Sequence, residues 1–383
     1  MSTAINSRDA VLSKASGLTT VAFVVNGSPD SAMGHRAREM ASRISGFDVR
    51  IAHRSARKLV SIFSLFLSLV SMRPAVSYVF DISYSGIIGA ALYKMLFRNR
   101  LIVETGDAIT ELVRSTGSRG PVGLWLTHLL ETFAFNVCDQ IVVRGTFHKE
   151  WLAKRGIRSE VIQDGVDSQK FAASDASEIR KQHGLEDVIT VGLIGSSVWS
   201  EKLQTCYGSE LVELLPLLVD RPIKGVMIGS GSGISHLKAK SREYGIEDRI
   251  VFLGYVTYED LPAHLGLIDI CLSTQTNNLV GRVRTTGKLP LYLAAGRYVL
   301  ASNVGEALRV LPNQQLVDYD GVKDMNYPLK LKVRIEEILS EPDITKHSQN
   351  NTVLARNYFD YEILAERMKR VIDDSLGAAR SRA

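Results

Sequence analysis

Short apolar runs of strand length alternate with longer amphipathic segments along most of the chain. In the first half the apolar runs fall at residues 19–25, 47–52, 76–81, 100–104, 140–144 and 159–163. Segments with helical periodicity lie between them, among them residues 37–44, 86–97 and 122–137. Strands that alternate with helices are typical of a parallel sheet covered by helices on both faces. The pattern predicts an α/β fold.

The same alternation begins again after a polar stretch at residues 171–187, which carries helix-start signals and no strong apolar period. Six further apolar runs follow, at residues 189–195, 223–229, 249–254, 270–274, 297–302 and 314–319. We therefore predict two Rossmann-like domains joined by a linker. The predicted ranges are a flexible leader at 1–18, a first domain at 19–170, a linker at 171–187, a second domain at 188–356, and a C-terminal region at 357–383 whose amphipathic helix (357–376) packs back on the body.

One apolar segment, residues 59–72, raises the question of a membrane. Arg57, Lys58 and Arg73 flank it. Fourteen residues of helix rise only about 21 Å, which is short of the roughly 30 Å hydrocarbon core of a bilayer. As a helix, the segment is therefore too short to span a membrane. Two interpretations stay open: a helix buried against a sheet, and a helix that also rests on an anionic membrane surface.

Composition and charge narrow the class of protein. The chain has 383 residues, of which 45% are hydrophobic and 23% are charged, as in ordinary soluble globular proteins. The formal net charge of +5 suits anionic small molecules or a membrane surface better than nucleic acid. The three cysteines are far apart and form no CxxC pair, which argues against a disulfide framework and a zinc site. We expect a cytoplasmic protein, with the inner membrane surface as a candidate place of contact.

Two loops of the first half follow predicted strands. The loop containing Gly34 leads into a helix with Arg36 and Arg38, and its backbone NH groups can receive an anion or a sugar hydroxyl. It lacks GxGxxG spacing, so a dinucleotide site is not supported, and a plain turn is the alternative. Glu104 and Asp107 follow the strand at 100–104, at the edge where ligands bind in such sheets. Asp107 is interpreted either as a site carboxylate or as the cap of the next helix.

Loops of the second half carry basic residues and glycines. The segment 192–215 is predicted to form a strand, a Gly/Ser loop containing Ser197 and Lys202, and a helix. A basic residue in such a loop suits the binding of a diphosphate. The segment 228–233 repeats the strand-then-glycine arrangement, and either loop is alternatively a connector. The richest segment is 284–302, RTTGKLPLYLAAGRYVLAS. Arg282, Arg284 and Lys288, with hydroxyls and free NH groups between them, predict a diphosphate site, the alternative being a solvated basic loop.

Three segments in this order resemble GT-B glycosyltransferases of the large retaining family 4. They are QDGVDSQKF (163–171), GYVTYEDLPAHLGLIDICLST (254–274) and KLPLYLAAGRYVLAS (288–302). The first is similar to the family's interdomain turn, and the other two are similar to its donor-binding signatures. The resemblance implies two facing Rossmann-like domains with a cleft between them. It also implies that the first domain holds the acceptor and the second holds a nucleotide sugar.

The resemblance also implies roles for individual residues. The implied reaction is front-face attack with retention, in which a phosphate oxygen takes the acceptor's proton and cations stabilise the departing diphosphate. It needs no metal and no cofactor, and we interpret no DxD pair in the sequence as a metal site. The catalytic candidates are Asp107, Arg282 and Lys288; the donor-binding candidates are Gly34, Ser197, Lys202, Gly254, Tyr255, Val256, Arg284, Thr286, Gly287 and Leu289.

The sequence departs from the family at two positions. The family usually has glutamates where this chain has Val283 and Leu291, and the second glutamate accepts hydrogen bonds from ribose hydroxyls. Loss of such a bond costs about 1.5 to 3 kcal/mol, or tenfold or more in affinity. Extra arginines that compensate, a donor with fewer ribose hydroxyls, and lost catalysis are all open explanations.

The sequence therefore predicts a glycosyltransferase that moves a sugar from a nucleotide-diphosphate donor to a saccharide, a lipid-linked acceptor or a small molecule. Two alternatives stay open. One is a catalytically inactive GT-B homologue that acts as partner or regulator of an active enzyme. The other is a nucleotide-sugar epimerase.

Overall fold

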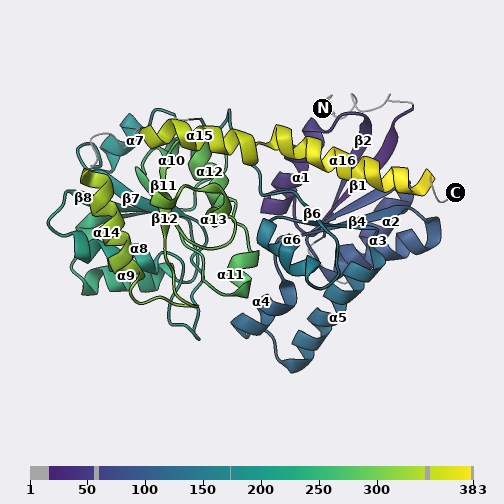
Figure 1. The fold of residues 1–383 in the computed structure, drawn as a ribbon, viewed down its shortest axis with the longest axis horizontal. Coiled ribbons are helices and arrows are strands. Elements are labelled where there is room, and N and C mark those ends of the chain that lie inside the picture. The colour runs from purple at the N-terminus through teal and green to yellow at the C-terminus, as the bar shows by residue number, and fades with distance from the viewer. Residues whose placement is uncertain (1–16, 56–59, 173, 341–345, 381–383) are drawn as a thin grey trace, which may run out of the picture. The chain divides into compact units, whose positions relative to one another are not determined.

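The computed structural model describes residues 17–55, 60–172, 174–340 and 346–380, and its core is two six-stranded sheets with flanking helices (Figure 1). The first sheet has the order β2-β1-β3-β4-β5-β6, and β1 is parallel to both β2 and β3, as β5 is to β6. Its strands are β1 (Thr19–Val25), β2 (Phe47–His53), β3 (Val76–Phe80), β4 (Arg100–Thr105), β5 (Gln140–Val143) and β6 (Glu160–Val161). All six predicted runs of the first half form strands.

The second sheet has the order β12-β11-β10-β7-β8-β9, again with parallel neighbours. Its strands are β7 (Ile189–Ile194), β8 (Ile223–Ile228), β9 (Ile250–Gly254), β10 (Ile270–Ser273), β11 (Tyr298–Ser302) and β12 (Leu316–Val317). The strand order reverses between β7 and β10. In open parallel sheets, ligands bind at the carboxyl ends of strands beside such a reversal. The predicted α/β fold with two parallel sheets is confirmed.

Helices connect the strands of both sheets and place apolar side chains against them. In the first half they are α1 (Ala32–Arg43), α2 (Val60–Met72), α3 (Tyr84–Phe97), α4 (Ile109–Thr116), α5 (Pro121–Val137) and α6 (Thr146–Ala153). In the second half they are α7 (Ser177–Gln182), α8 (Ser209–Leu214), α9 (Ile234–Glu243), α10 (Leu261–Leu265), α11 (Leu279–Val283), α12 (Lys288–Ala294), α13 (Ala307–Val310), α14 (Tyr327–Ser340), α15 (Lys346–Tyr358) and α16 (Tyr361–Arg380).

Packing groups the chain into two compact units that do not coincide with the two sheets. One unit contains the described residues up to Val103, together with Ala134–Gln140 and the chain from Met368. The other contains Glu104–Phe133 and Ile141–Arg367. The domain ranges drawn from the sequence therefore stay a prediction. The predicted leader, apart from residues 17 and 18, and the flanking pair Arg57 and Lys58 lie outside the described residues.

The predicted C-terminal helix at 357–376 begins and ends at other residues. The chain forms α15, which ends at Tyr358, and α16, which begins at Tyr361. Between them the NH of Val166 donates to the carbonyl of Phe359 at 2.9 Å, and the NH of Tyr361 donates to the carbonyl of Val166 at 3.0 Å. Because this backbone pairs with Val166, it is not available for a continuous helix. The turn at QDGVD, which contains Val166, thus fixes the start of α16, although the two segments lie far apart in the sequence.

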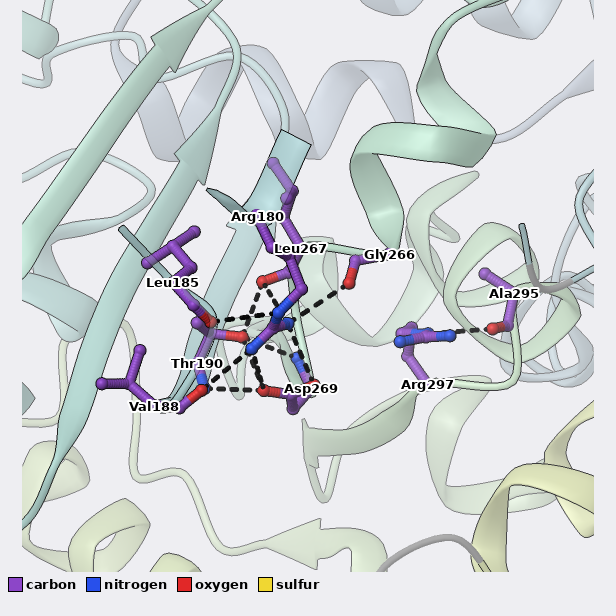
Figure 2. Close-up of polar contacts among 9 residues, drawn as sticks. All are labelled: Arg180, Leu185, Val188, Thr190, Gly266, Leu267, Asp269, Ala295 and Arg297. Carbon is purple, nitrogen blue, oxygen red and sulfur yellow. Dashed lines mark hydrogen bonds and ion pairs between the residues drawn. The ribbon is translucent and has the colours of Figure 1, made fainter. Parts of the chain in front are cut away.

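A partly buried arginine, Arg180, holds the predicted linker against the second sheet. The guanidinium of Arg180 donates to the carbonyl of Val188 at 2.9 Å and to both carboxylate oxygens of Asp269, at 3.3 and 3.4 Å (Figure 2). Asp269 also accepts hydrogen bonds from the NH and the hydroxyl of Thr190, at 2.8 and 2.9 Å. Residues 188 to 190 and 269 lie where β7 and β10 begin, so this network fixes the two central strands at the edge opposite their carboxyl ends.

Helix α2 corresponds to the apolar segment that raised the membrane question. Its residues Leu65 and Leu69 are buried, as the buried-helix interpretation requires. Its opposite face exposes Val60, Phe63 and Leu67, with 53%, 69% and 62% of their surface accessible. Within the described residues, no helix is both long and apolar enough to cross a membrane.

Candidate active site

A cavity of about 430 Å³ opens at the carboxyl edge of the second sheet, beside the strand-order reversal. The ends of β7, β8 and β9 form one side, and the first turn of α12 forms the other. Its volume falls within the roughly 300 to 1,000 Å³ that is typical of small-molecule sites. The lining residues are Ile194, Gly195, Ser196, Ile228, Gly229, Ser230, Tyr255, Val256, Leu261, Thr286, Gly287, Lys288 and Leu291.

Four of the donor-binding candidates predicted from the sequence and one of the catalytic candidates line this one cavity. The four are Tyr255, Val256, Thr286 and Gly287, and the catalytic candidate is Lys288. They come from two segments about 30 positions apart, the β9–α10 loop and the start of α12. Tyr255 has 76% of its surface accessible, which leaves its ring free to pack on a flat ligand. The cavity is therefore lined by apolar and aromatic groups, with a cation at the α12 side.

Lys288 lies over an aromatic ring and against a glycine. Its ammonium nitrogen is 3.1 Å from the centroid of the Tyr207 ring, a cation–π contact. A Cβ at Gly195 would lie 2.6 Å from the Lys288 Cε, so this approach requires glycine, whose φ here is +143°. Burial lowers the pKa of Lys288 to about 7, with a smaller opposing effect of Glu210 and a further lowering by Arg284.

Arg284 forms an ion pair with Asp107. Its Nε donates to the Asp107 Oδ1 at 2.8 Å, and both side chains are partly exposed. Asp107 does not cap α4, because the capping position is Ala108 and the carboxylate of Glu131 accepts the NH of Ile109 at 2.8 Å. The helix-cap interpretation of Asp107 is therefore wrong, and the carboxylate instead holds a cation. Next to Arg284, the hydroxyl of Thr285 donates to Asp164 at 2.6 Å.

Arg282 lies in a different setting from the other two cations. Its Nε donates to the Asn277 side chain at 2.9 Å, and its guanidinium lies 5.9 Å from the Phe147 ring centroid. It is not among the lining residues of the cavity described above, whereas Lys288 is. The three cations that the sequence grouped into one site thus have three different sets of contacts.

The other donor-site candidates have structural contacts of their own. Ser197 is fully buried and donates to the carbonyl of Tyr207 at 2.7 Å. Lys202 is exposed and donates to the carbonyl of Ser115 at 3.3 Å. Gly254 has a φ of +75°, and its carbonyl accepts from Gly229 at 2.7 Å. Leu289 is 5% accessible and packs in the core.

Gly34 lies in the first turn of α1, in the other compact unit. A Cβ there would lie 2.3 Å from the carbonyl oxygen of Pro29, and the NH of Gly34 donates to the capping hydroxyl of Ser31 at 3.1 Å. The loop therefore needs glycine at this position for its own packing.

The two departures from the family differ in position. Leu291 lines the cavity, whereas Val283 is fully buried. A side chain at 291 therefore contacts whatever the cavity binds. One at 283 contacts the core.

Sequence reasoning missed Glu210 and the role of Tyr207. Glu210 is in the first turn of α8 and accepts a hydrogen bond from the NH of Gly208 at 2.9 Å. Burial raises the pKa of Glu210, although Gly208 and Lys288 oppose this effect. Glu210 and Lys288 belong to no common sequence motif, so only the fold reveals that their charges interact. In the described part of the chain, no group of three or more His, Cys, Asp or Glu side chains is arranged to hold a metal ion.

The lining residues of the cavity lie within a segment that matches a known protein family. Residues 187–325 match the family model described as glycosyl transferases group 1. A GDP-mannose-dependent alpha-(1-6)-phosphatidylinositol monomannoside mannosyltransferase of Mycobacterium tuberculosis is 30% identical over 155 residues. That alignment covers 39% of this chain and 39% of the relative, so the chain matches about two fifths of the curated relative's length.

Solved structures resemble the chain over most of its length. Sucrose-phosphate synthase from Thermosynechococcus elongatus superposes with a TM-score of 0.74 at 14% identity, covering 94% of this chain and 100% of that one. Anabaena HepE in complex with UDP-glucose superposes with a TM-score of 0.72 at 14% identity, covering 93% and 99%. The chain therefore has the GT-B fold of these structures, and its residues 187–325 match the family model of the group 1 glycosyl transferases.

Proposed function

We propose that the protein transfers a sugar from a nucleotide-diphosphate donor to a saccharide, lipid-linked or small-molecule acceptor, with retention and without a metal. The observation that carries the proposal is the 430 Å³ cavity, which joins Tyr255 and Val256 to Lys288 within the segment that matches the family model. The cavity lies beside the strand-order reversal, and open parallel sheets typically bind nucleotides at such a point.

The lining supports an orientation for the donor. Tyr255, Val256 and Leu261 offer an apolar, partly aromatic surface that suits a nucleobase and ribose. Lys288 lies at the α12 side of the same cavity, where an ammonium group would bind the diphosphate. The family's ribose-binding glutamate is absent, since position 291 is a leucine.

In the proposed reaction the bond between the sugar's anomeric carbon and the diphosphate oxygen breaks as the acceptor oxygen bonds to the same face of that carbon. The acceptor's proton passes to a phosphate oxygen of the departing diphosphate. Negative charge therefore grows on the diphosphate, and Lys288 would stabilise it. Arg284, which Asp107 holds through their ion pair, is the second cation that we assign to this charge.

Incubation with nucleotide sugars tests the proposal. UDP-glucose and GDP-mannose are the first donors to use, with slow donor hydrolysis and transfer to simple acceptors followed by chromatography and product stereochemistry by NMR. We expect turnover that survives excess EDTA and yields the anomer of the donor. Conversion of the donor to an epimer without acceptor would favour an epimerase. Binding of donor without turnover would favour an inactive homologue, and no binding of any donor would contradict the proposal.

We further propose peripheral contact with an anionic membrane surface, in the reducing cytoplasm, where the three free cysteines would stay unpaired. Helices α2 and α3 pack against each other and both expose large apolar residues. On α2 these are Val60, Phe63 and Leu67; on α3 they are Leu92, Met95, Leu96 and Phe97. Exposed Arg73 and Arg98 follow the two helices, which supports attraction to anionic lipid.

Flotation with vesicles tests this contact. We expect the protein to float with vesicles that contain phosphatidylglycerol and less with pure phosphatidylcholine. The double substitution Val60→Asp with Leu67→Asp should abolish flotation. Leu329→Asp with Val333→Asp is the matched control, because these α14 residues are 51% and 54% accessible and lie on another element. Equal loss in both double variants would contradict a specific membrane face.

A further inference from the structure

Helix α5 (Figure 1) has polar side chains on its inner face. Thr127 and Glu131, one turn apart, are 3% and 7% accessible. The hydroxyl of Thr127 accepts a hydrogen bond from Arg119 at 2.8 Å, and the carboxylate of Glu131 accepts the NH of Ile109 at 2.8 Å. A helix on the surface of a soluble protein normally turns its apolar face inward and its polar face outward. Along these turns α5 does the opposite.

The outer face of α5 is apolar and exposed. Its residues are Val122, Trp125, Leu126, Leu129 and Phe133, with 71%, 58%, 52%, 43% and 42% of their surface accessible. At about 3.6 residues per turn these five positions fall within about 100° of arc, so they form one continuous stripe along the helix. We call them the α5 stripe. Single exposed apolar residues are normal in soluble proteins, whereas a contiguous group marks a surface that contacts another molecule.

The exposed part of α5 carries no charged side chain. Between Arg119 and Asp139 the sequence contains one charged residue, Glu131, and its side chain is buried. The exposed residues that border the α5 stripe are His128, Thr132 and Asn136. Helices that rest on an anionic membrane carry Lys and Arg on their polar face, and a charged protein partner would need opposite charges here. The α5 stripe therefore suits a partner surface that is itself apolar and uncharged.

The order of residues in the α5 stripe makes it complementary to itself. Val122 and Phe133 lie at its two ends and Leu126 and Leu129 lie between them, and both pairs are centred between positions 127 and 128. Two such helices can pack antiparallel about a two-fold axis through this centre. Val122 of one copy then faces Phe133 of the other, and Leu126 faces Leu129. A small side chain thus meets a large one at each end of the contact.

The area of the α5 stripe is sufficient for a pair of copies. The accessible fractions of its five side chains correspond to roughly 500 Å² of apolar surface on each copy. Two copies would therefore bury about 1,000 Å² between them, which is the size from which a specific protein interface is expected. Interfaces at this lower limit are typical of association that depends on protein concentration.

We propose that the α5 stripe is the interface of a homodimer, in which the α5 helices of two copies pack antiparallel about a two-fold axis. Trp125 is the anchor of this interface, because binding energy concentrates in large aromatic side chains near the centre of a contact. The polar border of His128, Thr132 and Asn136 forms the rim. The inward position of Glu131 keeps its charge out of the contact.

Analytical ultracentrifugation of the full chain tests the dimer. Between about 1 and 100 µM protein we expect the measured mass to rise from that of one chain towards that of two. Leu126→Asp with Leu129→Asp brings four carboxylates together in the contact and should keep the protein monomeric at the highest concentration. Leu329→Asp with Val333→Asp is the matched control, because these exposed α14 residues lie outside the stripe, and it should dimerise as the original protein does. A monomeric original protein throughout this range, or equal loss of dimer in both double variants, would overturn the proposal.

Crosslinking tests the antiparallel arrangement without weakening the dimer. A short bismaleimide should join Val122→Cys to Phe133→Cys when the two variants are mixed. Neither variant should be joined to itself, because the two copies of one such position lie roughly 16 Å apart along an antiparallel pair. The original protein, which has three free cysteines, gives the background. Joining of Val122→Cys to itself would show parallel packing and refute this dimer.

Folding and lipid contact are checked on the same variants. Leu126 and Leu129 are exposed, so the Asp double variant should keep its helix content by circular dichroism. If that variant unfolds, the crosslinking result decides. If the original protein is monomeric and the folded variant loses flotation with vesicles containing phosphatidylglycerol, the α5 stripe contacts lipid and the homodimer is refuted.

Discussion

The ammonium nitrogen of Lys288 lies 3.1 Å from the centroid of the Tyr207 ring, beneath the first turn of α12. Burial there lowers the pKa of the lysine to about 7. The amine is therefore only partly charged at neutral pH in the absence of ligand. A bound diphosphate favours the charged form, so it raises the pKa of Lys288.

Nucleotide binding should therefore be linked to proton uptake. Below pH 7 the free amine already carries its proton, whereas above pH 7 binding must take one up. We expect the affinity for UDP or GDP to fall as the pH rises from 7 to 8.5, by up to tenfold per pH unit. Calorimetry at pH 8 in two buffers of different ionisation enthalpy measures the proton uptake directly.

Two substitutions control this measurement. Lys288→Ala should weaken nucleotide binding and abolish the proton uptake, with little change in melting temperature. Lys288→Arg keeps a charge at every pH in this range, so its binding should lose the pH dependence. An unchanged affinity in Lys288→Ala would remove Lys288 from the donor site.

The ion pair between Asp107 and Arg284 joins residues 177 positions apart. Asp107→Asn keeps the shape of the side chain but removes the charge that holds the guanidinium. Because the pair is partly exposed, the free energy of unfolding should fall by no more than about 1 kcal/mol. If Arg284 stabilises the departing diphosphate, kcat should fall by about tenfold or more while donor KM changes little. Steady-state kinetics tests this, and a change confined to KM would contradict the assignment.

Much of the fold follows from local sequence pattern, because each strand coincides with an apolar run that can be recognised in the sequence. The start of α16 does not, since its position depends on the backbone of Val166. The site divides in the same way. Tyr255 and Lys288 were found because they belong to contiguous motifs, but the contact of Lys288 with Tyr207 and the pairing of Asp107 with Arg284 arise only when distant segments meet.

Asp269 shows how a motif residue can serve the fold. It belongs to the segment IDICLST that resembles a family signature, yet its carboxylate binds Arg180 and Thr190 at the edge opposite the carboxyl ends of the strands. Asp269→Asn should lower the free energy of unfolding by about 2 kcal/mol, because several charge-assisted hydrogen bonds weaken. Urea unfolding measures this. Nucleotide affinity of the folded variant should stay within twofold, and a larger loss of affinity would give Asp269 a role in binding.

Leu291 and Val283 permit the sharpest test of how ribose is held. Leu291 lines the cavity, so Leu291→Glu places a carboxylate where ribose hydroxyls would lie. Affinity for a ribonucleotide donor should rise by about tenfold, and that for its 2′-deoxy analogue should rise less. Val283 is fully buried, so Val283→Glu buries an unpaired charge and should lower the free energy of unfolding by more than about 3 kcal/mol.

The two variants carry the same new side chain eight positions apart, and each is the control for the other. Calorimetry with UDP-glucose and with its 2′-deoxy form, beside thermal unfolding of both variants, separates binding from folding. Equal tightening of both donors by Leu291→Glu would show that charge in the cavity, and not a ribose contact, causes the gain. Weaker binding of both would mean that the carboxylate repels the diphosphate, so position 291 would then lie closer to phosphate than to ribose. Tightening of the ribonucleotide alone would instead show that a carboxylate at position 291 contacts the ribose, a contact that the apolar Leu291 cannot make.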